Sequence, residues 1–197
     1  MRYCELMVAF IRNKFLTRFI SQLPEGARVL DVGCGTGKTL LYLASARPDL
    51  YLYAVDINDV GAKLPSCVDF QIAKVEELVD IFQENLFDAV ICQHVIEHLQ
   101  FPMKMLDSFK KILKPGGVVY FETPNWTRLF IHFSFNFFWN DYTHIRPYSK
   151  MTFKRLLSNF NFTLLELRSF SSAPLISRKI IGPLIPDVLV AIAKNEK

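Results

Sequence analysis

The sequence has few cysteines, and they form no recognisable pattern. Its 197 residues include four, which are widely scattered and form no Cys-x-x-Cys pair: Cys4, Cys34, Cys67 and Cys92. A chain of this length builds its core without disulfide bonds. The sequence therefore excludes a disulfide-rich secreted scaffold, and we expect a protein of the reducing cytoplasm.

Long apolar runs and a strong charge imbalance are also missing. No stretch of about 18 consecutive apolar residues occurs, so we expect no transmembrane helix. Residues 3–23 are largely apolar, but Arg12, Lys14 and Arg18 interrupt them and no small-residue cleavage site follows, so we expect no secretion signal. The net charge is only +4, and we expect no nucleic-acid partner.

Apolar and aromatic residues, by contrast, are abundant. They make up 51% and 14% of the chain, which suffices for a packed core. The length corresponds to one domain. We predict a single domain over residues 1–197, with an N-terminal helical segment over 1–25. We also predict an aromatic insertion over 124–148, which either covers a site or fills the core beneath the end of a sheet.

Short β-branched runs alternate with longer helical stretches along most of the chain. The predicted strands cover residues 28–32, 51–56, 68–72, 87–92, 117–122, 162–169 and 188–193. The predicted helices cover residues 37–46, 75–83, 103–113 and 150–159. This alternation predicts an α/β fold, an open doubly wound sheet that is mostly parallel and carries helices on both faces.

The most specific motif is a buried strand that runs into three alternating glycines and then a helix, Val29 to Gly37. Glycines here allow positive φ and let a ligand lie against main-chain N–H groups. A dinucleotide loop needs a glycine where Lys38 stands, and a phosphate-binding loop needs one where Val32 stands, so both are disfavoured. A tight turn without any ligand remains the alternative.

Two aspartates suggest the ligand. Asp56 ends the second predicted strand, where an α/β sheet presents an acid to the two hydroxyls of a ribose. Asp31 precedes the glycines and could accept hydrogen bonds from an ammonium group or from the N–H groups of the loop. An adenosyl group that carries an amino acid instead of phosphates satisfies both.

At this point four segments resemble, in order, the class I S-adenosylmethionine-dependent methyltransferases. They are Val29 to Gly37, Tyr53 to Ile57, Phe87 to Cys92, and Leu113 to Gly117. Each segment is a weak signal alone, but four in this order at these spacings are a strong one, and the resemblance covers nearly the whole chain. The resemblance implies a Rossmann-like sheet of seven strands whose last strand is antiparallel, with S-adenosylmethionine as cofactor.

The resemblance also implies where the cofactor lies. Glycines 33, 35 and 37 would contact its methionine part, Asp56 its ribose and Ile57 its adenine. The relatives usually carry an aspartate for the adenine amino group where this chain has Lys74, so groups near Val75 or Glu76 would replace it. The complete predicted cofactor site is Asp31, Gly33, Cys34, Gly35, Gly37, Asp56, Ile57, Val75, Glu76 and Gln93.

Several titratable residues are candidates for a general base, namely His94, Glu97, His98 and His144. The segment from His94 to His98 matches the inverted zinc-protease pattern H-x-x-E-H, but its place at the end of a buried strand argues against a protease. It also resembles the Glu-x-x-Glu-His segment of ubiquinone-pathway O-methyltransferases. We predict a role without a metal, with a divalent ion as the open alternative.

The segment Asp141 to Ser149 is similar to the H-x-R-x-[YF]-S segment of a methyltransferase subfamily that acts on glycans and small metabolites. Pro147 favours extended backbone before it, so the side chains of His144 and Arg146 should point to one side. We predict His144 as general base or substrate orienter, Arg146 as a clamp for a hydroxyl or carboxylate, and His98 as a third catalytic residue; a purely structural role is the alternative. Ser149 should cap the next helix.

These observations predict an S-adenosylmethionine-dependent methyltransferase with a small-molecule acceptor. We predict methylation on oxygen or nitrogen, and a glycan or a lipid-linked compound is the open alternative for the acceptor. A catalytically silent cofactor-binding module is the main alternative. The amphipathic residues 3–23 and the apolar residues 180–185 leave peripheral membrane contact open. The sequence does not determine the oligomeric state.

Overall fold

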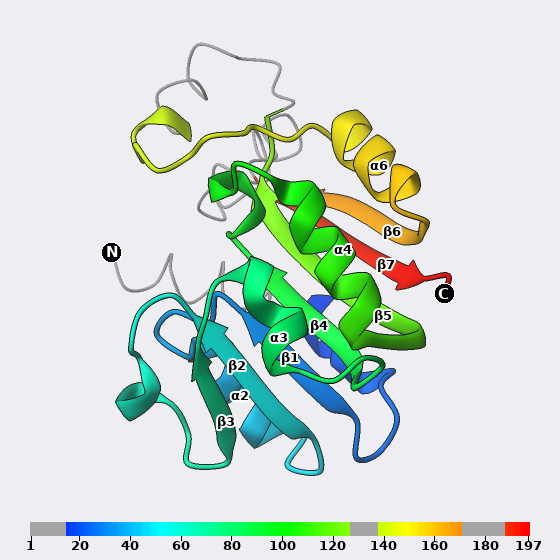
Figure 1. Cartoon of the computed structure of the whole chain (residues 1–197). Helices are drawn as coiled ribbons and strands as arrows, with labels where there is room; N and C mark the ends of the chain where they lie inside the picture. The colour runs from blue at the N-terminus through cyan, green and yellow to red at the C-terminus, as the bar shows by residue number, and fades with distance from the viewer. Residues whose placement is uncertain (1–14, 127–137, 171–187) are drawn as a thin grey trace, which may run out of the picture.

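The computed structural model describes residues 15–126, 138–170 and 188–197, and it contains one seven-stranded sheet (Figure 1). The strand order is β3-β2-β1-β4-β5-β7-β6. The strands are β1 (Arg28–Val32), β2 (Tyr51–Asp56), β3 (Val68–Ile72), β4 (Phe87–Gln93), β5 (Leu113–Pro124), β6 (Phe162–Phe170) and β7 (Val188–Asn195). The predicted fold class is confirmed.

The strand directions bring the predicted site to one edge of the sheet. The strands β1 to β5 pair in parallel, whereas β7 is antiparallel to both β5 and β6, as predicted for the last strand. The chain order reverses on the two sides of β1, where α/β sheets bind their ligands beyond the carboxyl ends of the strands. At that edge Val32 pairs with Val55 and Cys92, and Asp56 pairs with Ile72.

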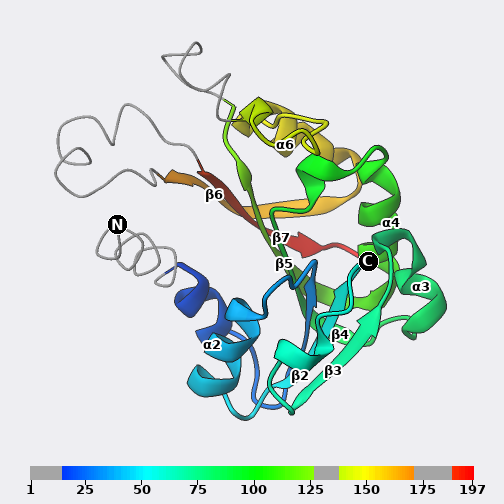
Figure 2. The same cartoon turned by 90° about the vertical axis from the view of Figure 1, so that its left-hand side faces the viewer.

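Helices cover both faces of the sheet, as Figure 2 shows. One face carries a helix over residues 15–21 and α2 (Lys38–Ala46). The other carries α3 (Leu78–Ile81), α4 (Pro102–Ile112) and α6 (Lys150–Asn159). Because successive strand side chains point to opposite faces, a strand between two helical layers must be apolar throughout. Thus Leu30 and Val32 belong to one buried cluster, and Val29 to the other.

Two predicted elements differ from the structure. The helix predicted over 75–83 is a short 3-10 helix, η2 (Val75–Glu77), followed directly by α3, which ends at Ile81 because Phe82 takes extended backbone. There its ring packs edge-on against Phe87, with centroids 5.0 Å apart. The strand predicted to begin at residue 117 begins at Leu113, which already pairs with Phe87 before a register shift.

Parts of two predicted segments lie outside the described residues. Of the N-terminal segment 1–25, residues 15–21 form a helix that buries Leu16, Phe19 and Ile20. Residues 1–14, residues 127–137 of the aromatic insertion, and the apolar residues 180–185 lie outside the described ranges. Among the helices that the structure describes, none is long and apolar enough to cross a membrane.

Candidate functional site

The glycine loop has the predicted backbone. Its φ angles are +71° at Gly33, +52° at Gly35 and +72° at Gly37, a region that side chains other than glycine disfavour. A Cβ atom on Gly33 would overlap Val95, and one on Gly37 would overlap Leu64. A Cβ atom on Gly35 would meet nothing within 4 Å. Gly33 and Gly37 therefore leave room for side chains from other segments, whereas Gly35 lies beside open space where a ligand can approach.

Asp56 closes this loop through hydrogen bonds from three donors. Its Oδ2 accepts from the backbone N–H of Gly35 at 2.9 Å, and its Oδ1 accepts from the backbone and side-chain nitrogens of Asn58 at 2.9 and 3.2 Å. A carboxylate accepts about four hydrogen bonds, so one position on Oδ2 is left for a ribose hydroxyl. To hold both hydroxyls, Asp56 needs the Asn58 side chain to move aside.

Asp31 is a buried carboxylate without a donor. Its side chain is almost inaccessible, with 2% of the residue exposed, and within the described ranges no N–H or O–H donates to it. Burial, and then the charge of Asp56, raises the pKa of Asp31 to about 7. The sequence left two kinds of donor open for Asp31, an ammonium group or the N–H groups of the loop. In the structure the N–H groups of the loop do not donate to it. A cation beside it would stabilise its charged form.

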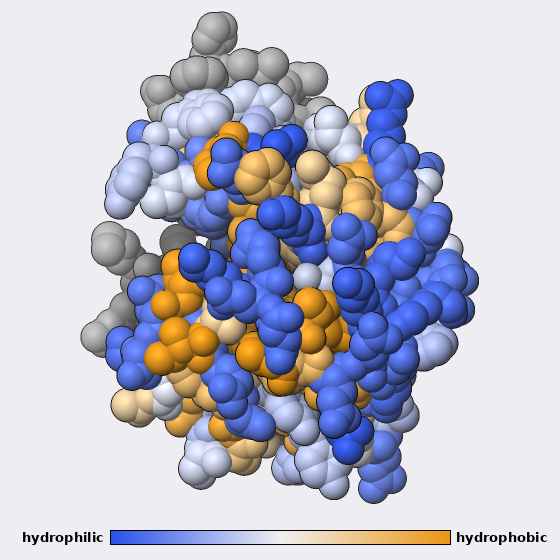
Figure 3. Space-filling view, in the orientation of Figure 1, coloured by the Kyte–Doolittle hydropathy of each residue, from blue (hydrophilic) through white to orange (hydrophobic). Residues whose placement is uncertain are grey.

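Exposed apolar side chains lie at the carboxyl ends of β2 and β3 (Figure 3). Ile57 is 70% exposed, and Ile72, which pairs with Asp56, is 59% exposed. Neighbouring Lys74 already uses its backbone N–H and C=O in hydrogen bonds with Glu77. Val75 and Glu76 open η2, so their N–H groups have no partner inside that helix. These groups fit a flat, polar-edged ring such as adenine.

The residues that follow β4 are tied to buried carboxylates. The side-chain oxygen of Gln93 accepts from Thr39 at 2.7 Å, and its nitrogen donates to Glu122 at 2.9 Å. Both ring nitrogens of His94 lie 3.2 Å from carboxylate oxygens, one of Glu97 and one of Glu122. His94 therefore has no free nitrogen to act as a general base, although the sequence made it a candidate.

His98, in the 3-10 helix η3 (Ile96–His98), keeps one ring nitrogen without a hydrogen-bond partner among the described residues. Thr143 Oγ1 donates its only proton to Asp141 Oδ1 at 2.5 Å, so it must accept from His98 Nδ1, which lies 2.8 Å away. This network places the proton of a neutral His98 on Nδ1. The lone pair of Nε2 is then available to accept a proton. Thr143 links the other ring nitrogen, Nδ1, to the Asp141 carboxylate.

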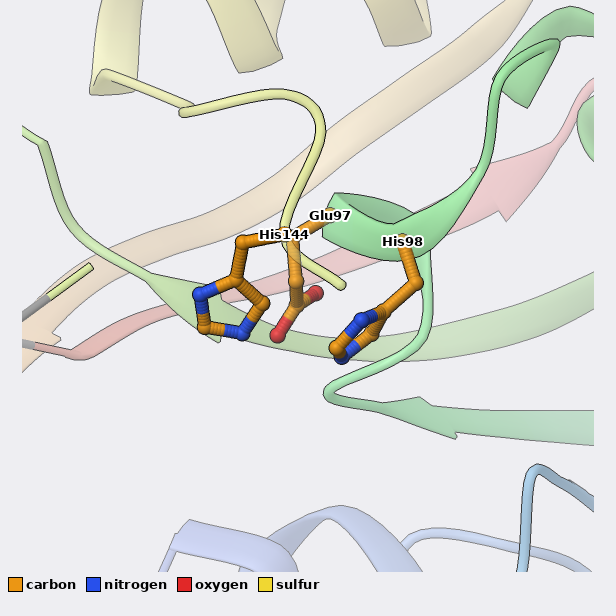
Figure 4. A group of neighbouring side chains, drawn as sticks. All are labelled: Glu97, His98 and His144. Atoms are coloured by element: carbon orange, nitrogen blue, oxygen red, sulfur yellow. The ribbon is translucent and has the colours of Figure 1, made fainter. Parts of the chain in front are cut away.

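His144 lies beside His98, although 46 positions later in the chain. Their ring centroids are 4.7 Å apart. His144 Nδ1 donates to the carbonyl oxygen of Phe138 at 2.7 Å, and its Nε2 lies 3.8 Å from Asp141 Oδ2. Figure 4 shows the Glu97 carboxylate between the two imidazoles, all three side chains projecting to the same side of their backbone.

The three groups of Figure 4 also resemble a metal site in composition. One ligand-type atom from each of Glu97, His98 and His144 lies within 4.8 Å of the other two. Both oxygens of Glu97 are already used, however, since Oε1 faces His94 and Oε2 accepts from Thr123 at 3.0 Å. This carboxylate needs no ion to be satisfied, and a site that works without a metal remains our prediction.

Arg146 is held by its backbone and not by its side chain. The N–H groups of Ile145 and Arg146 both donate to the backbone carbonyl of Glu97, at 2.8 and 3.0 Å. The guanidinium is exposed and has no acidic partner among the described residues, which suits a clamp for an acceptor. Ser149 accepts from the N–H of Thr152 and caps α6, which confirms its predicted role.

The structure thus assembles two groups of predicted residues at one edge of the sheet. Asp31, Cys34 and Asp56 gather at the glycine loop, and Val75 and Glu76 follow the neighbouring strand β3. His98 and His144 meet in the second group, with Arg146 exposed beside them. The sequence analysis missed Glu122 and Thr143; a charged residue inside the apolar run of β5 was the available signal for Glu122.

Comparison with known proteins agrees with this geometry. Residues 5–167 match the sequence model of a family described as a methyltransferase domain. The chain is 37% identical over 110 residues to a ubiquinone biosynthesis O-methyltransferase from Xanthomonas campestris. The match covers 52% of this chain and 45% of that protein, so the chain spans a little under half the length of this curated relative.

Solved structures show the same fold. A SAM-dependent methyltransferase from Archaeoglobus fulgidus superposes with a TM-score of 0.72 at 23% identity, over 97% of this chain and 94% of that one. A 1,6-didemethyltoxoflavin-N1-methyltransferase from Burkholderia thailandensis, solved with S-adenosylhomocysteine, gives a TM-score of 0.68 at 16% identity. It covers 96% of this chain and 77% of that one.

Proposed function

The chain belongs to the class I S-adenosylmethionine-dependent methyltransferases, and on that premise we propose that it methylates an oxygen atom of a small-molecule acceptor. The observation that carries the cofactor half of this proposal is Asp31, a buried carboxylate at the glycine loop to which no donor of the described residues bonds. The ammonium group of S-adenosylmethionine is a cation of the right kind to satisfy it.

The remaining parts of the cofactor fit the other groups at this edge. Asp56 offers an acceptor position to the ribose, and the exposed side chains of Ile57 and Ile72 offer apolar faces to the adenine. The N–H groups of Val75 and Glu76 can donate to ring nitrogens of the base. When bound, the cofactor supplies an electrophilic methyl group on a positively charged sulfur.

The acceptor half of the proposal follows from the two histidines. A hydroxyl becomes a good nucleophile when a base removes its proton during attack. We assign that base to His98, because its Nε2 is free and Asp141, through Thr143, stabilises the imidazolium that forms. His144 then orients the acceptor, the second of the two roles predicted for it.

The proposed reaction moves a proton and a methyl group. His98 Nε2 takes the hydroxyl proton while the acceptor oxygen bonds to the methyl carbon, and the carbon–sulfur bond breaks with its electron pair left on sulfur. The products are a methyl ether, S-adenosylhomocysteine and an imidazolium that returns its proton to water. Alignment of oxygen, carbon and sulfur, and exclusion of water, supply most of the rate.

The surroundings of His144 favour an aromatic acceptor. The rings of Trp126, Phe138 and Trp139 pack edge to face, with centroids 5.0 to 6.4 Å apart, and Phe138 also packs on His144 at 4.5 Å. Aromatic side chains bind a flat phenolic ring well. The relatives named ubiquinone biosynthesis O-methyltransferases are consistent with an oxygen acceptor. A glycan or lipid-linked acceptor and peripheral membrane contact stay predictions.

Two measurements test the proposal. S-adenosylmethionine, NAD and ATP are compared by thermal shift, where about a hundredfold excess over the dissociation constant stabilises a protein by roughly 2.7 kcal/mol. Transfer of labelled methyl to 3,4-dihydroxybenzoate and other catechols is then assayed. We expect S-adenosylmethionine alone to stabilise the protein and label to appear in a catechol. Binding without transfer to any acceptor favours the silent module, and stabilisation by NAD overturns the proposal.

A further inference from the structure

The residue directly after β4, His94, has an unusual backbone. Its φ is +54°, in the left-handed region where residues other than glycine are uncommon. Its N–H still donates to the carbonyl of Glu122 at 2.8 Å and so continues the pairing of β4 with β5. Such strained positions persist only where the surrounding structure holds them, and here the imidazole contacts provide that hold.

The imidazole of His94 bridges two carboxylates that are completely buried. Nδ1 lies 3.2 Å from Glu97 Oε1, and Nε2 lies 3.2 Å from Glu122 Oε1. Carboxylates only accept hydrogen bonds, and both ring nitrogens donate only in the imidazolium form. Burial alone would lower the pKa of His94, but the hydrogen bonds to Glu122 and Glu97 outweigh it and raise that pKa to about 9.

Each carboxylate leads to a different half of the site. Glu122 Oε2 accepts from Gln93, whose other end accepts from Thr39 at the start of α2, just past the glycine loop. Glu97 belongs to η3 with His98, and its backbone carbonyl receives the N–H groups of Ile145 and Arg146. The His94 ring therefore lies between the cofactor loop and the segment that carries His144.

We propose that His94 is a positioning residue, a built-in cation that joins Glu122 on the cofactor side to Glu97 on the acceptor side. This inference rests on the proposed function for its catalytic meaning, but the geometry it describes can be tested without any acceptor. Without the bridge, the two buried carboxylates lose the cation that lies between them. Glu97 would then shift, and its carbonyl would hold Ile145 and Arg146 less firmly.

The main test is amide hydrogen exchange in the full chain. The variant His94→Asn suits it, because asparagine tolerates the left-handed backbone but carries no charge and is too short to bridge. We expect the amides of Ile145 and Arg146 to exchange at least tenfold faster, and the Gly35 amide, which donates to Asp56, to change less than twofold. A variant with unchanged exchange at both amides overturns the proposal.

A second variant separates bridging from charge balance. His94→Asn with Glu122→Gln restores the net charge of the buried group but not the bridge. We expect stability to recover in part while Ile145 and Arg146 stay fast; if their protection also returns, the bridge is not needed and the proposal fails. Lys114→Gln is the control, because it removes one positive charge from a partly buried pair with Asp88 and should change neither amide.

A measurement on the unaltered protein avoids any dependence on folding of the variants. In protein labelled with nitrogen-15 histidine, we expect both ring nitrogens of His94 to carry protons at neutral pH; a neutral ring overturns the proposal. In catalysis, His94→Asn should lower kcat/KM for the acceptor at least tenfold, with affinity for S-adenosylmethionine within twofold. If the unaltered protein does not bind S-adenosylmethionine, the proposed function fails, while the exchange result still decides the bridge.

Discussion

At the scale of single residues, hydrogen-bond direction separates histidines that look alike in the sequence. His94 has carboxylates at both ring nitrogens and is fixed in place. His98 has one nitrogen tied to Thr143 and the other free. His144 donates to a backbone carbonyl and faces Asp141. Among the described residues, His98 and His144 each keep one ring nitrogen without a hydrogen bond, and His98 differs in that the Thr143 hydroxyl links it to the Asp141 carboxylate.

The first prediction concerns His98 and His144, the two histidines that we propose act on the acceptor. His98→Ala should lower kcat by about 10² to 10⁴, the usual contribution of a general base, because the hydroxyl proton then has no acceptor. His144→Ala should mainly raise KM for the acceptor, since it removes a contact and not the base. Affinity for S-adenosylmethionine, measured by calorimetry, should stay the same in both. Full turnover in His98→Ala would show that another group takes the proton.

The second prediction concerns Tyr148, whose buried hydroxyl has no hydrogen-bond partner within the described structure. Burial raises its pKa above the usual value. A buried polar group without a partner costs about 1–3 kcal/mol, so Tyr148→Phe should leave the free energy of unfolding unchanged or raise it by about 1 kcal/mol. Urea unfolding measures this. A loss above about 1 kcal/mol would mean that the hydroxyl has a partner, such as bound water.

At the scale of elements, the glycine loop shows that three alternating glycines serve different purposes. Two of them make room for side chains from other segments, namely Val95 after β4 and Leu64 after a short 3-10 turn. The sequence indicates that all three allow positive φ. It does not indicate which neighbours they make room for, because those neighbours come from parts of the chain that only the fold brings near.

The third prediction uses this difference between Gly33 and Gly35. Gly33→Ala should cost about 2 kcal/mol or more in unfolding free energy, from the positive φ and the overlap with Val95. Gly35→Ala should cost only the φ term, about 1 kcal/mol, yet weaken S-adenosylmethionine binding more strongly, because the methyl group enters the open space of the loop. Urea unfolding and calorimetry compare the pair. Equal stability losses would contradict the packing argument.

The strand and helix pattern was largely predictable, and the exceptions have a physical cause. Runs that are apolar on both faces, such as β1 and β4, predicted a sheet between helical layers. The helix predicted over 75–83 is 3-10 in its first turn and ends two residues early, where Phe82 takes extended backbone and packs against Phe87. The length of β5 was underestimated, since a glycine turn at Gly116, with φ of +75°, is tolerated inside the strand.

At the scale of the whole molecule, the site is built on an unbalanced charge. Asp31 is buried near Asp56, and no donor of the described residues bonds to it, which costs stability until a cation binds. Function and stability therefore oppose each other at this position, as is common in active sites. Binding of the positively charged cofactor should relieve this cost.

The fourth prediction follows from the raised pKa of Asp31, about 7 against an ordinary value of 3.8. Between these values the folded protein binds more protons than the unfolded chain, so the free energy of unfolding falls as pH rises from about 4 to about 7. Asp31→Asn should remove this slope and stabilise the cofactor-free protein above pH 7 by up to about 4 kcal/mol, since the shift is about three pKa units and one unit equals about 1.4 kcal/mol.

The same variant should bind S-adenosylmethionine at least tenfold more weakly, because its amide cannot pair with an ammonium group. Urea unfolding at pH 5 and pH 8, and calorimetry with the cofactor, measure the two effects. Asp56→Asn serves as the comparison at the neighbouring carboxylate, whose oxygens already accept three hydrogen bonds. An unchanged pH slope in Asp31→Asn would show that Asp31 titrates normally in the folded protein.

By itself, the sequence determined the sheet, its flanking helices, the glycine loop and the acid at the end of β2. Those features depend on local periodicity and on backbone freedom, which neighbouring residues encode. Only the tertiary structure decided which histidine has a free nitrogen, that Glu122 joins the site, and that Asp31 has no donor. Hydrogen bonds between side chains have directions and short ranges, and they exist only after folding has placed distant segments against one another.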